Sequence, residues 1–178
     1  MNYLWYSMGL HGNITDPGTN AWSIVQEAKS YGIDTRTSPY NWYDNMKIAW
    51  EIQGIKAKNP KARIAVLGES YGDNAVLAIC NMLVWGFGQP VTVDLACGFQ
   101  RSTKGGVQFK VPPNVVKAIE IYDSNIVTDK YGADPWALAP GNTVTQLQNI
   151  DIDAEHPGDF GQGRDIVMAA VKIFSEAP

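Results

Sequence analysis

Residues 62–85, which read ARIAVLGESYGDNAVLAICNMLVW, decide the fold. The run 62–67 is short and dominated by apolar residues, which is typical of a buried strand. Residues 74–85 are apolar on nearly every side, as expected of a helix that packs beneath a sheet. Between them stands GESYG at 68–72, a match to the G-x-S-x-G pattern. A strand, a tight turn and a helix in this order predict a nucleophile elbow centred on Ser70.

The glycines of this motif have a steric role in such a turn. The serine backbone is strained there, and side chains at positions 68 and 72 would collide with the neighbouring strand or helix. The five-residue match is a weak signal by itself, and its placement between strand and helix gives it weight. We therefore expect the Ser70 hydroxyl at the carboxyl end of the sheet, facing the positive end of the following helix dipole.

Strand-like runs alternate with helical segments on both sides of the motif, and this alternation predicts an α/β fold with a parallel sheet. The expected strands are 3–8, 33–38, 62–67, 91–99, 115–123 and 144–152, and the expected helices are 21–31, 42–58, 74–85 and 162–176. The prediction is one domain, 1–178, with an approximately six-stranded, mostly parallel sheet flanked by helices. Two long segments, 100–114 and 124–143, lack helical period and are expected to be functional loops.

Composition limits the kind of protein. The chain has 178 residues, 45% of them hydrophobic and 18% charged, which fits one globular core. Eighteen acidic residues against fourteen basic ones give a net charge of −4, and no basic run or RNA-binding motif occurs, which argues against nucleic acid as the main partner. Cys80 and Cys97 have no metal-binding or redox spacing, so we expect two buried thiols.

The start of the chain and its apolar runs bear on membranes and location. Residues 1–7 read as a strand, without a basic region, an apolar segment or a cleavage site of a secretion signal. The longest apolar run, 75–85, is shorter than the roughly 20 residues that cross a bilayer. The expectation is a soluble, cytoplasmic protein with no stable membrane insertion.

A serine hydroxyl needs a base, and the chain offers two histidines. His156 follows the last expected strand and should lie at the carboxyl edge of the sheet, so we expect it to be the general base. A neutral imidazole is required, so activity should fall below roughly pH 6.5. His11 lies in the glycine-rich segment after the first strand, where it is expected to line the substrate site.

The histidine should be oriented by a carboxylate in the chain order nucleophile, acid, histidine. Asp123 is the best placed, because it ends the strand before the histidine strand. Asp129 is the second candidate for the acid. Asp94 is the third and least favoured, because it lies inside an expected strand. Asp73 and Glu69 flank the serine too closely to reach the far side of the imidazole.

Hydrolysis through an acyl-enzyme also needs donors for the oxyanion. We expect the backbone N–H of Tyr71 to be one donor and that of Leu10, in the glycine-rich segment 9–12, to be the other. Trp136 is a candidate substrate contact together with His11, and plain packing is the alternative for the tryptophan.

This arrangement resembles the α/β-hydrolases over nearly the whole chain, from Gly9 through Ser70 to His156 and the last helix. In size and order it is similar to the minimal, cap-less lipases of bacilli. The sequence departs from the family pattern at two positions. Met8-Gly9 replaces the His-Gly that precedes the oxyanion residue in the family, and Glu69 precedes the serine where the family often has histidine. The resemblance implies a compact α/β-hydrolase fold with no cap domain, and hydrolysis of small-molecule carboxylic esters with no metal or organic cofactor.

Other functions use the same features. An acyl thioesterase or an amidase would employ the same triad, and a hydrolase fold without catalysis could serve as an interaction scaffold. A flavodoxin-like binding module also alternates strand and helix, but the glycine spacing after the first strand and the absence of a P-loop argue against it. Acyl length and oligomeric state remain open at the level of sequence.

Overall fold

A computed structural model describes residues 1–8, 16–17, 19–36, 44–85, 88–99, 109–122, 135–152 and 161–176. Its elements in chain order are β1 (Asn2–Ser7), α1 (Asn20–Ser30), β2 (Asp34–Arg36), α2 (Asn45–Lys58), β3 (Arg63–Glu69), α3 (Tyr71–Trp85), β4 (Val93–Phe99), β5 (Val115–Tyr122), β6 (Gln146–Asp151) and α4 (Gly161–Glu176). Strands and helices alternate as expected from β1 to β4, and no described helix separates β4, β5 and β6, where the sequence predicts long loops.

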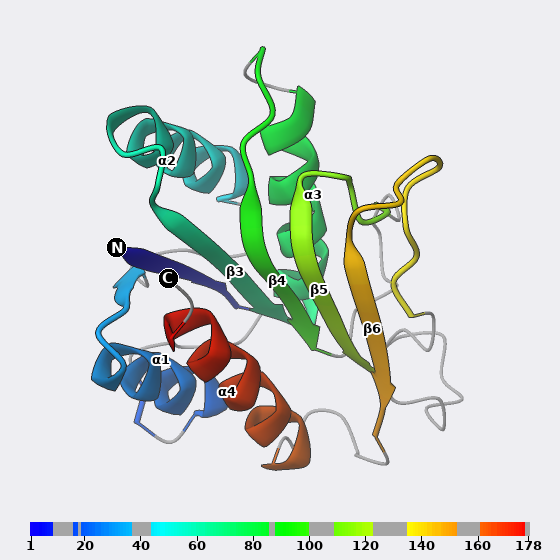
Figure 1. Ribbon diagram of the computed structural model, residues 1–178. Coiled ribbons are helices and arrows are strands. Elements are labelled where there is room, and N and C mark those ends of the chain that lie inside the picture. The colour runs from blue at the N-terminus through cyan, green and yellow to red at the C-terminus, as the bar shows by residue number, and fades with distance from the viewer. Residues whose placement is uncertain are drawn as a thin grey trace.

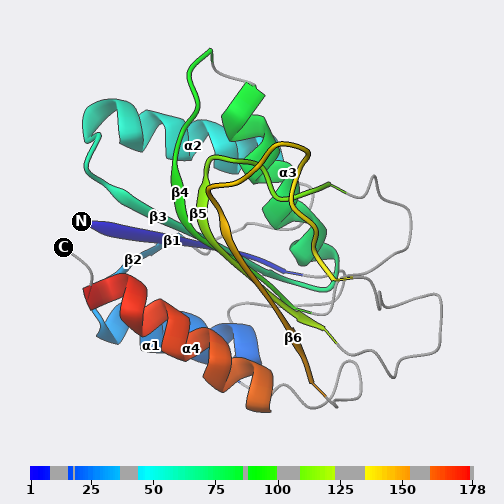
Figure 2. The same ribbon diagram turned by 45° about the vertical axis from the view of Figure 1, so that its right-hand side comes forward.

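The six strands form one parallel sheet with the order β2-β1-β3-β4-β5-β6. Helices α2 and α3 cover one face of this sheet, and α1 and α4 cover the other (Figures 1 and 2). The chain moves outward in opposite directions from β1 and β3, so these two strands flank the topological switch point. In open α/β sheets, ligands bind beyond the carboxyl ends of the strands at such a point.

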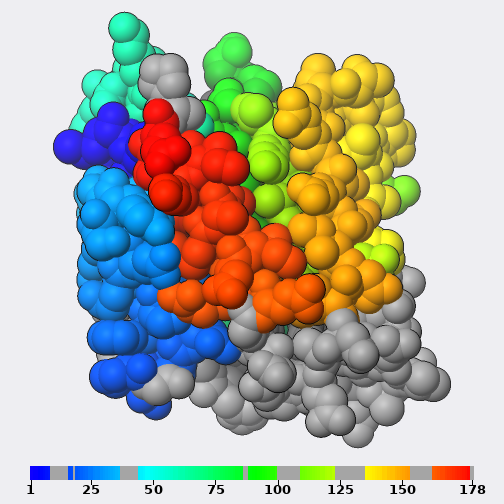
Figure 3. Space-filling model, turned by 60° about the horizontal axis from the view of Figure 1, so that its bottom comes forward, coloured from blue at the N-terminus to red at the C-terminus, as the bar shows by residue number. Residues whose placement is uncertain are grey.

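The sheet separates two hydrophobic cores, and the alternation of β1 illustrates this. Leu4 and Tyr6 belong to the core beneath α1 and α4, whereas Trp5 between them belongs to the core beneath α2 and α3. Burial on both faces explains why the central strands are almost continuously apolar. On the face covered by α1 and α4, helix α4 lies along α1 (Figure 3), and Arg164 of α4 forms an ion pair with Glu27 of α1.

The predicted bounds differ from the observed ones at the elbow itself. The expected strand stops at residue 67 and the expected helix starts at 74, but β3 continues through Glu69 and α3 begins at Tyr71. The strand is longer because Gly68 and Glu69 still pair with Gly98 and Phe99 of β4. The turn is therefore the single residue that lies between them.

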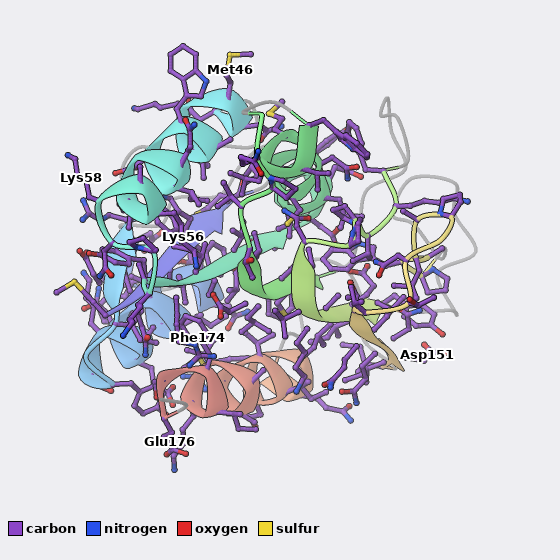
Figure 4. All side chains as sticks on the ribbon, turned by 45° about the horizontal axis from the view of Figure 1, so that its top comes forward. Met46, Lys56, Lys58, Asp151, Phe174 and Glu176 are labelled. Carbon is purple, nitrogen blue, oxygen red and sulfur yellow. The ribbon has the colours of Figure 1, made fainter. Side chains whose placement is uncertain are left out.

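A cluster at the amino edge of the sheet joins the two ends of the described chain. The Asn2 side chain donates a hydrogen bond to the carbonyl of Ser175, 3.1 Å away. The Arg63 guanidinium lies 4.7 Å from the centre of the Phe174 ring and forms a 3.4 Å ion pair with Asp94. Phe174 projects from α4 toward the sheet (Figure 4), and the N and C labels of Figure 1 lie close together.

Within the described ranges, no helix combines the length and the apolar character needed to span a bilayer. The helices in these ranges connect or follow strands of the sheet, and no described insertion forms a cap over its carboxyl edge.

Candidate functional site

Ser70 occupies a strained turn between β3 and α3. Its φ is 55°, and no other non-glycine residue in the described ranges has a positive φ. The left-handed conformation is unfavourable for a residue with a Cβ, so the surrounding structure must impose it. Two backbone hydrogen bonds do so: the Ser70 N–H donates to the carbonyl of Phe99 at 2.9 Å, and the Asp73 N–H donates to the Ser70 carbonyl at 3.2 Å.

The two glycines of the motif are required by close backbone contacts. A Cβ on Gly68 would overlap the carbonyl of Gly72, and a Cβ on Gly72 would overlap the carbonyl of Ser7 at the end of β1. The first contact lets α3 turn back directly above β3. The second brings the amino end of α3 against the strand that leads to the glycine-rich segment. The predicted steric role of both glycines is confirmed.

The amino end of α3 points toward the carboxyl edge of the sheet beside Ser70. Tyr71 is the first residue of this 15-residue helix, so its backbone N–H belongs to the end that carries the positive dipole. Because β1 and β3 flank the switch point, the serine lies where the topology places ligands.

A buried polar cluster lies behind the elbow on the α3 side of the sheet. Asp73 and Glu120 are both fully buried, and the Trp136 indole N–H donates to Asp73 Oδ1 at 2.9 Å. The three side chains meet over Gly98, where a Cβ would collide with all of them. Gly68 and Gly98 are paired neighbours in β3 and β4, so the absence of two side chains makes room for the elbow and for this cluster.

Asp73 lies in the first turn of α3, and the burial of its carboxylate was not predicted from the sequence. Glu120 was missed altogether. The available signal was a charged residue in the apolar strand VVKAIEIY, at a position that alternation assigns to the same face as Ala118. In the described part of the chain, His, Cys, Asp and Glu side chains form no group of three or more that could hold a metal ion.

Both cysteines are buried free thiols, as predicted. Burial raises the pKa of Cys80 to about 12. Burial also raises the pKa of Cys97, and the negative charges of Glu120 and Asp73 raise it further. Neither thiol is ionised near neutral pH, so neither is a reactive nucleophile.

Trp136 lies in the interior and is 1% exposed. Its backbone carbonyl accepts a hydrogen bond from the Asn149 side chain of β6 at 2.9 Å, and its ring belongs to the core beneath α2 and α3. The following residues are held by a short parallel pairing of Leu138 with Val111. These contacts favour the packing interpretation of this tryptophan over direct contact with a substrate.

Glu69, the residue before the serine, faces the opposite core. The Tyr6 hydroxyl of β1 donates a hydrogen bond to Glu69 Oε2 at 3.0 Å. Burial raises the pKa of the Glu69 carboxyl, and this hydrogen bond partly opposes the rise. The carboxylate therefore binds a residue of the neighbouring strand β1.

The candidate acid, base and oxyanion loop are outside the described residues. The residues concerned are Leu10, His11, Asp123, Asp129 and His156. The described strands lead directly to them: β1 ends at Ser7, β5 ends at Tyr122, and β6 ends at Asp151, which Figure 4 labels. Asp94, the third candidate for the acid, pairs with Arg63 near the start of β4, at the opposite edge of the sheet from Ser70.

No protein-family model matches the sequence. No curated protein matches it either. Two solved structures do share its fold. A cutinase-like protein from Cryptococcus sp. has a TM-score of 0.50 and 15% identity, over 98% of this chain and 92% of that one. An acetyl xylan esterase in an iodinated complex has a TM-score of 0.50 and 10% identity, over 97% and 95% of the two chains. The prediction of an α/β fold with a six-stranded parallel sheet flanked by helices is confirmed, and this fold is shared with these esterase structures. The finer similarity to minimal lipases of bacilli stays a prediction.

Proposed function

We propose that this chain is a serine esterase that hydrolyses small-molecule carboxylic esters through an acyl-enzyme on Ser70. The observation that carries the proposal is the backbone of that residue, a positive φ of 55° at a one-residue turn between a parallel strand and a helix. Strain of this kind persists where surrounding contacts enforce it, and it concentrates at functional sites. The close backbone contacts at Gly68 and Gly72 leave no room for a Cβ, as expected of so tight a turn.

The strand order supports His156 as base and Asp123 as acid. In a parallel sheet all carboxyl ends lie at one edge, and both residues follow strands of this sheet. Neighbouring strands are about 4.8 Å apart, so β6 ends on the order of 14 Å from β3. The connection from Ile152 to α4 can extend about 3.3 Å per residue, so its length is sufficient for a histidine to return to Ser70. Asp129 remains the alternative acid.

The proposed reaction has two balanced halves. The Ser70 oxygen attacks the ester carbonyl while His156 accepts the hydroxyl proton, and the alcohol leaves with that proton. Water then attacks the acyl-enzyme, gives a proton to His156 and releases the carboxylic acid, and the proton returns to the serine. The N–H groups of Tyr71 and Leu10 would stabilise the oxyanion in both halves, at about 3 kcal/mol for each donor. No metal or organic cofactor enters these steps.

The contact between the elbow and β1 supports the choice of Leu10. Gly72 packs against the carbonyl of Ser7, and its Cβ position also lies 3.0 Å from the carbonyl carbon of Met8. Met8, the last described residue before the glycine-rich segment, therefore lies beside the first turn of α3. Two N–H donors from these two segments are within reach of the same oxygen if the glycines let the backbone approach.

The test is hydrolysis of p-nitrophenyl acetate, butyrate and octanoate at pH 8 by the parent and by Ser70→Ala. Acetate comes first, because one structure with this fold is an acetyl xylan esterase. We expect turnover by the parent and a loss of at least about 1000-fold in the variant. Equal rates in the two proteins would refute the serine mechanism, and turnover of thioester or anilide analogues alone would assign a thioesterase or an amidase.

A further inference from the structure

A partly buried side-chain hydrogen bond joins the two strands whose ends the proposed reaction must hold in register. Tyr6 is the second-last residue of β1, and Glu69 is the last residue of β3. The backbone pairing of these strands ends at Ser7 and Gly68. Glu69 is the next residue along, so its 3.0 Å bond with the Tyr6 hydroxyl extends the connection one residue closer to Ser70.

The surroundings of this bond make it strong. Tyr6 is fully buried in the core beneath α1 and α4, together with Met8, Leu67 and Phe99. The negative charge of Glu69 adds to burial in raising the pKa of the Tyr6 hydroxyl, so the phenol keeps its proton and remains a donor. A hydrogen bond to a carboxylate in a medium of low dielectric constant is stronger than one in water.

We propose that Tyr6 and Glu69 form a positioning pair, whose hydrogen bond fixes the offset between Ser70 and the segment that follows β1. This inference rests on the proposed function, because that segment would supply the second oxyanion donor. Oxyanion donors act only within a few tenths of an ångström of the correct distance, and an error of about 1 Å costs on the order of 100-fold in rate. The pair touches no reacting atom and acts through the residues that follow it.

The chain provides a matched control for this pair. The Tyr31 hydroxyl donates to Glu27 Oε1 at 2.8 Å, next to the end of α1. The donor and acceptor groups are the same as in the Tyr6 pair. The location differs, because α1 is on the outer layer and neither residue belongs to β1 or β3. Loss of the Tyr31 bond should therefore affect stability and leave the reaction unchanged.

The experiment measures kcat and KM for p-nitrophenyl butyrate at pH 8, and urea unfolding, for the parent, Tyr6→Phe, Glu69→Gln and Tyr31→Phe. We expect Tyr6→Phe to lower kcat at least about 10-fold with KM within twofold, since mispositioning weakens only the transition state. Glu69→Gln retains an oxygen acceptor and should stay within about threefold of the parent. Tyr31→Phe should keep the parent kcat.

Each other outcome has a defined meaning. Equal kcat values for Tyr6→Phe and Tyr31→Phe would overturn the proposal. A Glu69→Gln variant as inactive as Ser70→Ala would also overturn it, because the charge of Glu69 and not the hydrogen bond would then determine the rate. If Tyr6→Phe does not fold, Glu69→Leu removes the acceptor and carries the same expectation. A parent no faster than Ser70→Ala would refute the proposed function itself, which distinguishes that failure from failure of the positioning pair alone.

Discussion

The left-handed backbone at Ser70 predicts that glycine is preferred over alanine there, although alanine is the better residue in most ordered positions. At a φ of 55° a residue with a Cβ costs about 1–2 kcal/mol. Glycine avoids this cost but loses about 0.5–1 kcal/mol more backbone entropy on folding. The balance favours Ser70→Gly over Ser70→Ala by about 1 kcal/mol. In a chain of 178 residues this is a difference of about 2–4 °C in Tm.

The assay compares the urea and thermal unfolding of the two variants. Both lack the hydroxyl, so the comparison isolates the backbone and does not depend on any activity. Gly54 is the control position, since it lies inside α2 with nothing within 4 Å of its Cβ position and has an ordinary φ. There Gly54→Ala should raise the free energy of unfolding by about 0.5–1 kcal/mol. If alanine is as stable as glycine at position 70, the elbow is not strained as described.

Three further outcomes follow from contacts around the elbow. Gly72→Ala should lower the free energy of unfolding by about 2–3 kcal/mol, because its Cβ would overlap a backbone carbonyl that cannot rotate away. A urea titration that shows a higher free energy of unfolding, as expected for Gly54→Ala, would contradict this. Trp136→Phe removes a 2.9 Å hydrogen bond to a buried carboxylate and should lower the free energy of unfolding by about 2 kcal/mol in the same titration. A decrease of less than about 0.5 kcal/mol would show that the bond contributes little to stability. Because burial raises the folded-state pKa of the Glu69 carboxyl, its contribution to stability is fully present at acid pH and is lost as pH rises from the ordinary value of 4.5 through the raised one. Glu69→Gln does not titrate, so its stability relative to the parent should increase between pH 4 and pH 8, and a constant difference would contradict the pKa shift.

The layered fold was predictable because its signals are local. Short apolar runs, helical spacing and turn residues identified six strands and four helices. The prediction failed at the junctions near the serine. Propensity ends a strand at glycine, whereas pairing with β4 continues β3 through Gly68 and Glu69.

The polar contacts around the elbow could not be predicted, because they join residues far apart in sequence. Tyr6 and Glu69 are 63 positions apart, and so are Asp73 and Trp136. Composition and periodicity carry no information on which strands become neighbours, so the partner of a buried side chain cannot be identified until the sheet order is known. Gly98 shows the same limit, since a Cβ at this position would collide with side chains from three other parts of the chain, Asp73, Glu120 and Trp136.

The hydrogen bond from Asn2 to the carbonyl of Ser175 holds the two described ends of the chain together at the amino edge of the sheet. Ser70 is at the carboxyl edge, so a support or fusion partner attached near either end would leave the elbow facing the solution. A few glycine and serine residues would also be enough to join the ends covalently. The chain could then be reopened at the turn near Gly88, where φ is 77°, to give a circular permutant with the same sheet.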